Sequence, residues 1–411
     1  MKLSEKNIAI TLLFVGAILR LRQYFSGRSL WADEAMLALN IVNRNFAELF
    51  KPLEYDQGAP LGFLLVEKLF NALFGRTELV LRFFPMLAGL ASLWLFYLLL
   101  MSLRGGALRQ TQDKLREQRS NLLAESEIAS GYRPRNDGVG FLLALALFAF
   151  NPQLVYYTSE AKQYIVDVAV ALGLLLLAIP IFQNQFNRKN IILLAIAGIL
   201  ALWFSHPALF VLAGIGVALV IQCLRTREYK NLRTTFGIGL LWLANLALLY
   251  FINLRQLSQN NYLANYWAEG FISLSLGSDL GWIGDLINYQ FDIQFIPLLV
   301  FVLILIGWFA LFREQRSLAL AFVFTTLFAF TASALRLYPV NGRLSLFLIP
   351  LEILLLGKTV EFLHQTFSSN KFVSLGITFV LSGYLFVNPL VTSFQNFISP
   401  KYYEHIRPTM Q

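Results

Sequence analysis

The chain has 411 residues, of which 57% are hydrophobic and only 14% are charged. A soluble protein of this size needs more polar side chains to cover its surface. The composition therefore excludes a water-soluble globule. The mean hydropathy of +0.60 indicates an integral membrane protein. The net charge of +9 resides mostly in short gaps between apolar runs, a pattern of membrane topology rather than nucleic-acid binding. A single cysteine, Cys223, excludes an internal disulfide and a zinc site built on paired thiolates.

Eleven apolar segments have the length expected of membrane-spanning helices, about 17 to 25 residues with a few somewhat shorter. They predict an all-α polytopic membrane protein. The first is interpreted as an uncleaved span, because Arg20 and Arg22 stand where a signal peptide would have small cleavage-site residues. The segments lie at 7–24, 79–103, 138–156, 162–182, 191–205, 207–224, 235–253, 293–312, 317–334, 344–363 and 371–388.

The distribution of Lys and Arg predicts the orientation, since basic residues resist export. The loops 104–137 and 224–233 are strongly basic and are predicted to be cytoplasmic. The smaller loops with Arg188 and Lys189, and with Arg313 and Arg316, fall on the same side. The loops 25–78 and 254–292 are then exported, and the second of these has four acidic residues against Arg255 alone. We therefore expect a protein of the cell (inner) membrane whose active site faces the exported, periplasmic side.

The loops also predict the domain organisation. Within the first exported loop, 31–50 and 60–74 are amphipathic and of helix length, which indicates two helices lying along the membrane interface. The segment 104–137 is rich in Gln, Arg, Ser and Glu, which is typical of a solvated, partly disordered loop. We expect residues 1–411 to form one membrane-embedded domain without a separate C-terminal soluble domain.

Ionisable residues near apolar spans are costly and therefore point to function. Carboxylates and cations from separate exported loops suit a reaction in which a carboxylate removes a proton from an acceptor while cations hold a phosphate leaving group. Glycosyl transfer from a lipid phosphate is such a reaction, and a polyprenyl donor would keep its tail in the bilayer. The candidates are Asp33, Glu34, Asp56, Glu160, Lys162, His206 and Arg343.

Four motifs together resemble the GT-C glycosyltransferases, in the branch of the protein O-mannosyltransferases and the ArnT-like lipid A sugar transferases. They are Trp31-x-Asp33-Glu34-Ala35, Asp-x-x-x-Pro-Leu at 56–61, Leu-Arg-Phe-Phe-Pro at 81–85, and the stretch 157–164. The resemblance implies a GT-C-like helical bundle and an inverting transfer from a polyprenyl-phosphate sugar. Two features depart from the family: the sequence ends about where an exported globular domain often begins, and the Asp56 stretch lacks the His and paired prolines of many relatives.

The resemblance also implies roles for individual residues. Asp33 is the expected catalytic base, with Glu34 as its neighbour in an acidic pair and Glu160 as the second acidic position. Lys162 and Arg343 are expected near the donor phosphate. Further candidates for substrate binding are Asp56, Tyr164, His206 and Tyr338.

Several of these residues also have a structural interpretation. Asp33-Glu34 would suit the N-terminus of a helix, where acids are favoured. Arg343 could be an interfacial anchor with its charge in water. Asp167 is interpreted as a polar contact between helices, and His206 suits either a solvated turn or a site.

The aromatic residues and the carboxylates leave further expectations. Trp267 and Trp282 are interpreted as residues of the membrane-interface belt rather than sugar platforms. The carboxylates would suit a hard cation such as Mg²⁺ or Mn²⁺, although His206 has too few partners for a three-ligand site.

Two other functions compete with glycosyl transfer. A transporter or flippase of lipid-linked glycans should show inverted repeats and polar groups at the membrane midplane, and the sequence shows neither. A polysaccharide polymerase or ligase would use an exported loop rich in Arg and His, whereas 254–292 has only Arg255. The sugar and the acceptor, whether protein, lipid or glycan, stay open; the expected partners are the polyprenyl-phosphate-linked donor and the lipid bilayer, with no nucleic acid.

Overall fold

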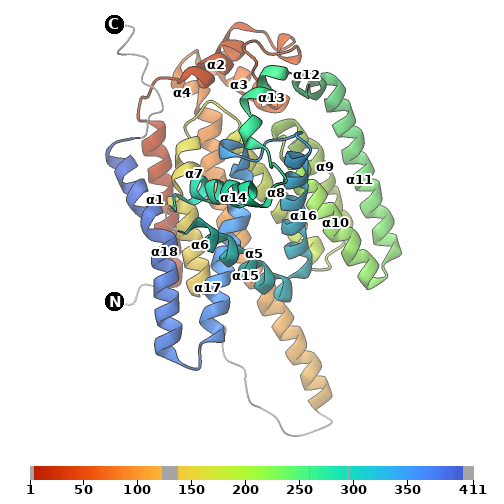
Figure 1. Ribbon diagram of the computed structural model, residues 1–411. Helices are drawn as coiled ribbons and strands as arrows, with labels where there is room; N and C mark the ends of the chain where they lie inside the picture. Colours follow the sequence, from red (N-terminus) through yellow and green to blue (C-terminus); the bar gives the residue numbers. More distant parts are fainter. Residues whose placement is uncertain (1–3, 123–137, 259, 294–295, 401–411) are drawn as a thin grey trace.

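The computed structural model describes residues 4–122, 138–258, 260–293 and 296–400, and within these ranges the chain is helical and contains no strand (Figure 1). A helix occupies each of the eleven predicted spans. The predicted all-α polytopic membrane fold is therefore confirmed. The helices are α1 (Glu5–Tyr24), α5 (Phe83–Leu122), α6 (Gly138–Phe150), α8 (Tyr164–Phe182), α9 (Arg188–Phe204), α10 (Ala208–Thr226), α11 (Tyr229–Leu249), α15 (Pro297–Glu314), α16 (Arg316–Ala334), α17 (Ile349–Thr366) and α18 (Lys371–Ile398).

Seven stretches of the described residues are long and apolar enough to cross a bilayer by length and composition, and they belong to α5, α8, α10, α11, α15, α16 and α18. Helix α6 has only 13 residues, because the predicted span 138–156 is interrupted at Asn151. The Asn151 side chain accepts a hydrogen bond from the Leu154 backbone and Pro152 begins a new helix, α7 (Pro152–Tyr157). Proline at the first helical position and an asparagine cap are strong helix-start signals.

Short helices cover one end of the bundle, the upper end in Figure 1. Two of them, α2 (Ala32–Asn43) and α3 (Leu61–Phe74), occupy the stretches predicted to be interfacial helices. With them lie η1 (Glu48–Phe50), α4 (Glu78–Leu81), the π-helix η2 (Tyr250–Leu254), α12 (Arg255–Ser258) and α13 (Asn261–Tyr266). The segments η3 (Ala268–Gly270), α14 (Leu276–Phe291) and η4 (Gly342–Leu348) complete the chain.

Helix α5 differs from the prediction. The helix continues through Leu122, so 104–122 is helical where the composition predicted a loop. The residues here include Leu, Arg, Gln and Lys, which all favour a helical backbone, a preference that composition alone does not show. The remainder of the predicted loop, 123–137, lies outside the described residues.

Small residues bring the long helices close together. A Cβ on Gly307 of α15 would lie 1.9 Å from the Leu355 carbonyl oxygen of α17, and one on Gly140 of α6 would lie 2.4 Å from the Gly357 carbonyl oxygen. Such backbone contact at small residues is the usual mode of helix packing in membranes. It holds α17 between α6 and α15, and η4 leads directly into α17.

A buried arginine joins the first span to α6. The Arg20 guanidinium donates hydrogen bonds to the carbonyl oxygens of Gly16, Ala149 and Phe148. Phe148 and Ala149 are in the last turn of α6, where carbonyls have no partner within the helix. Arg20 thus supplies the C-terminal cap of α6, just before the turn into α7.

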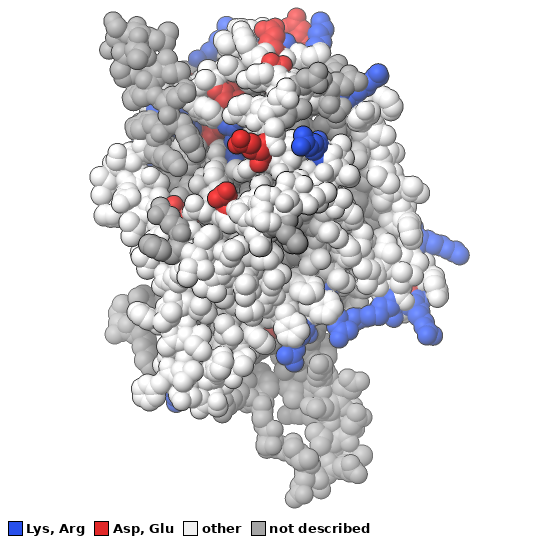
Figure 2. All heavy atoms as spheres, viewed as in Figure 1, with Lys and Arg blue, Asp and Glu red and all other residues white. Residues whose placement is uncertain are grey.

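Charges gather at the two ends of the molecule and leave a broad uncharged band between them (Figure 2). Most acidic side chains lie toward the upper end together with several Lys and Arg, and further Lys and Arg project from the lower half. Arg225, Arg313 and Arg316, from two loops predicted to be cytoplasmic, line one cavity at the ends of α10, α15 and α16. The loops that share a predicted side of the membrane therefore lie together.

Candidate functional site

The site centres on the Asp33 carboxylate in the first turn of α2. Its Oδ1 lies 3.0 Å from Lys162 Nζ, in the loop between α7 and α8, and its Oδ2 lies 2.9 Å from Arg343 Nη2, in η4. The Asp33 side chain is 21% exposed, whereas Lys162 is nearly buried. The structure thus brings together three predicted site residues that are far apart in the sequence.

The charge of Asp33 follows from these neighbours. Burial disfavours the charged carboxylate, but Lys162 and Arg343 outweigh this effect and hold the pKa of Asp33 below its usual range. Burial lowers the pKa of Lys162, and Asp33 opposes that shift. At neutral pH Asp33 is therefore a carboxylate, the form that can accept a proton.

Three aromatic rings surround the Arg343 guanidinium. Its central carbon lies 5.1 Å from the ring centroid of Trp31, 5.3 Å from that of Tyr164 and 5.5 Å from that of Trp267. A cation within about 6 Å of a ring centroid is attracted by the ring. The Arg343 side chain is only 12% exposed, which contradicts the interpretation as an anchor with its charge in water. Trp267, which the sequence analysis interprets as a belt residue, belongs to this cage.

Gln57 is a site residue that the sequence reasoning missed. Lys162 Nζ donates a 2.6 Å hydrogen bond to Gln57 Oε1, and Gln57 also helps to lower the pKa of Asp33. Its neighbour Asp56, a predicted substrate contact, is exposed and accepts a 2.8 Å hydrogen bond from Asn260 Nδ2. Asp56 therefore links the two loops predicted to be exported, and Gln57 reaches the reaction centre.

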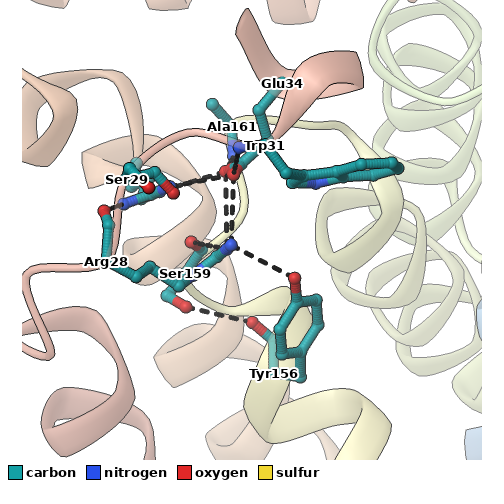
Figure 3. Close-up of polar contacts among 8 residues, drawn as sticks. Arg28, Ser29, Trp31, Glu34, Tyr156, Ser159 and Ala161 are labelled. Carbon is teal, nitrogen blue, oxygen red and sulfur yellow. Dashed lines mark hydrogen bonds and ion pairs between the residues drawn. The ribbon is translucent and has the colours of Figure 1, made fainter. Parts of the chain in front are cut away.

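Glu34 lies in a different environment from Asp33 (Figure 3). It is fully buried and pairs with Arg28 at 3.1 Å and with Arg82 at 2.8 Å; we call these three residues the Glu34 cluster. Its Oε1 also accepts the backbone N–H of Ala161 at 2.8 Å, and its Oε2 accepts that of Trp31 at 3.3 Å. Glu34, rather than Asp33, therefore provides the predicted helix-start contact.

The Glu34 cluster ties three chain segments together. Arg28 donates to the Ser159 carbonyl oxygen and the Tyr156 hydroxyl, and Arg82 donates to the carbonyl oxygens of Arg28 and Ser29. Glu34 directly follows Asp33 in the sequence, and Ala161 directly precedes Lys162. The Glu34–Ala161 contact is therefore next to the Asp33–Lys162 ion pair. Because Glu34 is fully buried and both of its oxygens are held by arginines and backbone N–H groups, we infer that Glu34 positions the site and does not react.

Glu160 is a buried carboxyl of another kind. It is fully buried, and neither of its oxygens has a hydrogen-bond partner. Burial and, second, the nearby Glu34 charge raise the pKa of Glu160 to about 8. At neutral pH Glu160 therefore holds its proton, which makes Asp33 the better candidate for the base.

The remaining candidates lie around the centre. Tyr338 donates a 3.0 Å hydrogen bond to the Leu344 carbonyl oxygen and so braces the turn that bears Arg343. Asp167 is buried in the first turn of α8, and its interpretation as a polar contact between helices stays a prediction. His206 lies in the turn between α9 and α10, where burial lowers its pKa to about 4; none of the contacts described above involves its ring.

A metal centre does not fit the described residues. Across 4–122, 138–258, 260–293 and 296–400, His, Cys, Asp and Glu side chains nowhere form a group of three that could hold an ion. Both oxygens of Asp33 already face cations. We therefore derive no step through Mg²⁺ or Mn²⁺.

Comparison with known proteins identifies the fold. No protein-family model and no curated protein matches the sequence. Solved structures do match. One is ArnT from Cupriavidus metallidurans in the apo state, with a TM-score of 0.51 and 16% identity over 88% of this chain and 61% of that one. Another is the Archaeoglobus fulgidus oligosaccharyltransferase in complex with zinc and sulfate, with a TM-score of 0.55 and 13% identity over 93% and 53%. A further match is the archaeal oligosaccharyltransferase AglB from Archaeoglobus fulgidus in complex with an inhibitory peptide and a dolichol-phosphate, with a TM-score of 0.51 and 9% identity over 96% and 56%.

At these identities the likeness concerns the fold. The chain spans 53% to 61% of the length of these proteins, so nearly all of it corresponds to a little over half of each. The predicted resemblance, made from four short motifs, agrees with this structural match. The chain is an integral membrane protein whose fold is similar to that of ArnT and the archaeal oligosaccharyltransferase.

Proposed function

We propose that the protein is a membrane glycosyltransferase that moves a sugar from a polyprenyl-phosphate carrier to an acceptor. The observation that carries this proposal is the Asp33 carboxylate held between Lys162 and Arg343 at one end of the bundle. A base beside two cations suits attack at a carbon whose leaving group is a phosphate. The dolichol-phosphate in the AglB complex supports a lipid phosphate as partner.

The chemistry is a single displacement with inversion. Asp33 removes the proton from the acceptor hydroxyl, whose oxygen attacks the anomeric carbon of the donor sugar. The bond from that carbon to the phosphate oxygen breaks, and Lys162 and Arg343 stabilise the phosphate that leaves. Without substrate, the Asp33 carboxylate pairs with both Lys162 and Arg343. When the donor binds, its phosphate pairs with these two cations instead, and the Asp33 carboxylate is free to act as base.

Lipids bound to the purified protein provide a direct test of this function. Mass spectrometry of the lipids that copurify should find a polyprenyl phosphate or its sugar ester. The purified protein, supplied with that sugar ester, should transfer the sugar and release polyprenyl phosphate. A protein that binds no such lipid and turns over no such donor would refute the proposal.

Arg343 should determine affinity for the lipid phosphate. We expect Arg343→Ala to weaken binding of a polyprenyl phosphate by roughly 2 kcal/mol, the scale of a charge-assisted contact. Arg343→Lys should restore only part of this, because an ammonium lacks the two-pronged geometry and stacks less well on the three rings. Titration of polyprenyl phosphate into the detergent-solubilised variants measures the difference. Equal affinities for wild type, Arg343→Ala and Arg343→Lys would show that Arg343 does not bind the phosphate.

The proposed orientation places the Asp33 end outside the cytoplasm, in the inner membrane of the cell, as the loop charges predict. After replacement of the buried Cys223, a cysteine at the exposed Glu269 should react with a membrane-impermeant thiol reagent in intact cells. A cysteine at the exposed Lys230 should react only after the cells are opened. The reverse pattern would place the site in the cytoplasm.

A further inference from the structure

A small polar pocket lies beside the reaction centre, between the loop that follows η1 and the end of α11. It has a volume of about 50 Å³, and Lys51, Gln57, Asn253 and Asn260 supply its polar lining. We call it the Asn253 pocket. Three uncommon structural features meet at its walls.

The first feature is backbone strain in the loop wall. Tyr55 and Asp56 both adopt left-handed conformations, with φ of 62° and 52°. Two consecutive non-glycine residues in this region cost free energy, and such residues occur mainly where a site requires them. The hydrogen bond from Asn260 to Asp56 holds the loop in this shape and so fixes Gln57 in the pocket wall.

The second and third features are on the other wall. Helix α11 ends in the π-helix η2, a distortion frequent at functional sites. Asn253 lies within η2, and its side-chain oxygen Oδ1 is buried without a hydrogen-bond partner. Leaving a buried acceptor unpaired costs about 1 to 3 kcal/mol, so this oxygen is suited to receive a donor from a ligand.

Gln57 connects the pocket to the reaction centre. It lines the pocket and at the same time accepts the hydrogen bond from Lys162 and contacts Asp33. A group held in the Asn253 pocket is therefore one side chain away from the base and the phosphate-binding cations.

We propose that the Asn253 pocket binds a neutral, hydrogen-bond-donating substituent of a sugar ring, such as a hydroxymethyl or acetamido group. A volume of about 50 Å³ leaves room for one such substituent. The unpaired Asn253 oxygen requires an O–H or N–H donor, and the amides of Gln57, Asn253 and Asn260 match uncharged polar groups. Lys51 also lines the pocket, but it is exposed to solvent. This inference rests on the proposed glycosyl transfer; the substituent belongs to the transferred sugar or to a sugar of the acceptor.

The test compares polyprenyl-phosphate sugars that differ only in this substituent, such as a hexose donor and its 6-deoxy analogue. Wild type should prefer the complete sugar by roughly 10- to 100-fold in kcat/KM. This is the ratio expected when the deoxy sugar leaves one buried acceptor, Asn253 Oδ1, without its hydrogen bond. Asn253→Leu should lose this preference, because turnover of the complete donor should fall much more than turnover of the deoxy donor. Asn253→Asp, which keeps an acceptor oxygen, should retain the preference. Asn265→Ala, an exposed amide outside the pocket, serves as the control.

The outcomes show whether the substituent belongs to the transferred sugar or to the acceptor, and they test the pocket separately from the proposed glycosyl transfer. Loss of preference among donors assigns the pocket to the transferred sugar; loss confined to a panel of glycan acceptors assigns it to the acceptor. If wild type discriminates neither panel, or if Asn253→Leu lowers turnover of complete and deoxy sugars equally, the pocket is not a sugar subsite. Failure of wild type to use any polyprenyl-phosphate sugar would instead refute the proposed function itself.

Discussion

Replacing Asp33 by Asn is expected to lower sugar transfer by roughly 100-fold or more, the usual contribution of a general base. Asparagine has nearly the same size but cannot accept the proton of the acceptor hydroxyl. Expression and binding of the lipid phosphate should persist, because Lys162 and Arg343 remain in place and lose the carboxylate that competes for them. Transfer rates measured at saturating donor, with binding measured separately, distinguish the loss of the base from the loss of the site.

Glu160→Gln is the matched control for Asp33→Asn. Since Glu160 is protonated at neutral pH, its conversion to an amide changes no charge, and the transfer rate should change much less. If Asp33→Asn transfers at nearly the wild-type rate while Glu160→Gln does not, the base is Glu160.

The largest effect on stability is expected at Glu34. In Glu34→Gln the guanidinium groups of Arg28 and Arg82 stay buried without their counter-charge, a situation that typically costs about 3 to 5 kcal/mol. Glu54→Gln is the control, because Glu54 also pairs with an arginine but is 67% exposed, and such pairs contribute at most about 1 kcal/mol. Thermal unfolding in detergent should therefore separate the two variants clearly.

The same variant tests the role inferred for Glu34. A positioning residue should affect stability and transfer together, and ligand binding should raise the unfolding temperature of the variant toward the wild-type value. If Glu34→Gln unfolds like wild type and yet fails to transfer sugar, Glu34 takes part in the reaction and our inference is wrong.

The long helices could be predicted because lipid imposes a strict length and hydropathy on a span. The exact ends could not, because they depend on local backbone chemistry. Asn151-Pro152 stops α6 within a continuous apolar run, and helix-forming polar residues extend α5 to Leu122. Hydropathy is blind to both effects.

The site was predictable only in part. Asp33, Lys162 and Arg343 stand out in sequence because a charge near lipid needs a reason. Adjacent residues of a helix point about 100° apart, so Asp33 and Glu34 face different surroundings although the sequence presents them as a pair. Gln57 and Trp267 gave no signal, because an uncharged amide and an aromatic residue are common at membrane interfaces.

The cap that Arg20 provides has a consequence for the order of assembly during synthesis. Arg20 contacts Ala149, which is 129 residues later in the chain, so the first helix enters the membrane long before its partner exists. Until α6 is made, the Arg20 guanidinium must remain solvated by headgroups or water, because placing a charged side chain in the hydrocarbon of the bilayer is strongly unfavourable. The first helix is therefore expected to settle at its final depth only once α6 has inserted beside it, which makes the pairing of these two helices an early checkpoint in the biogenesis of the protein.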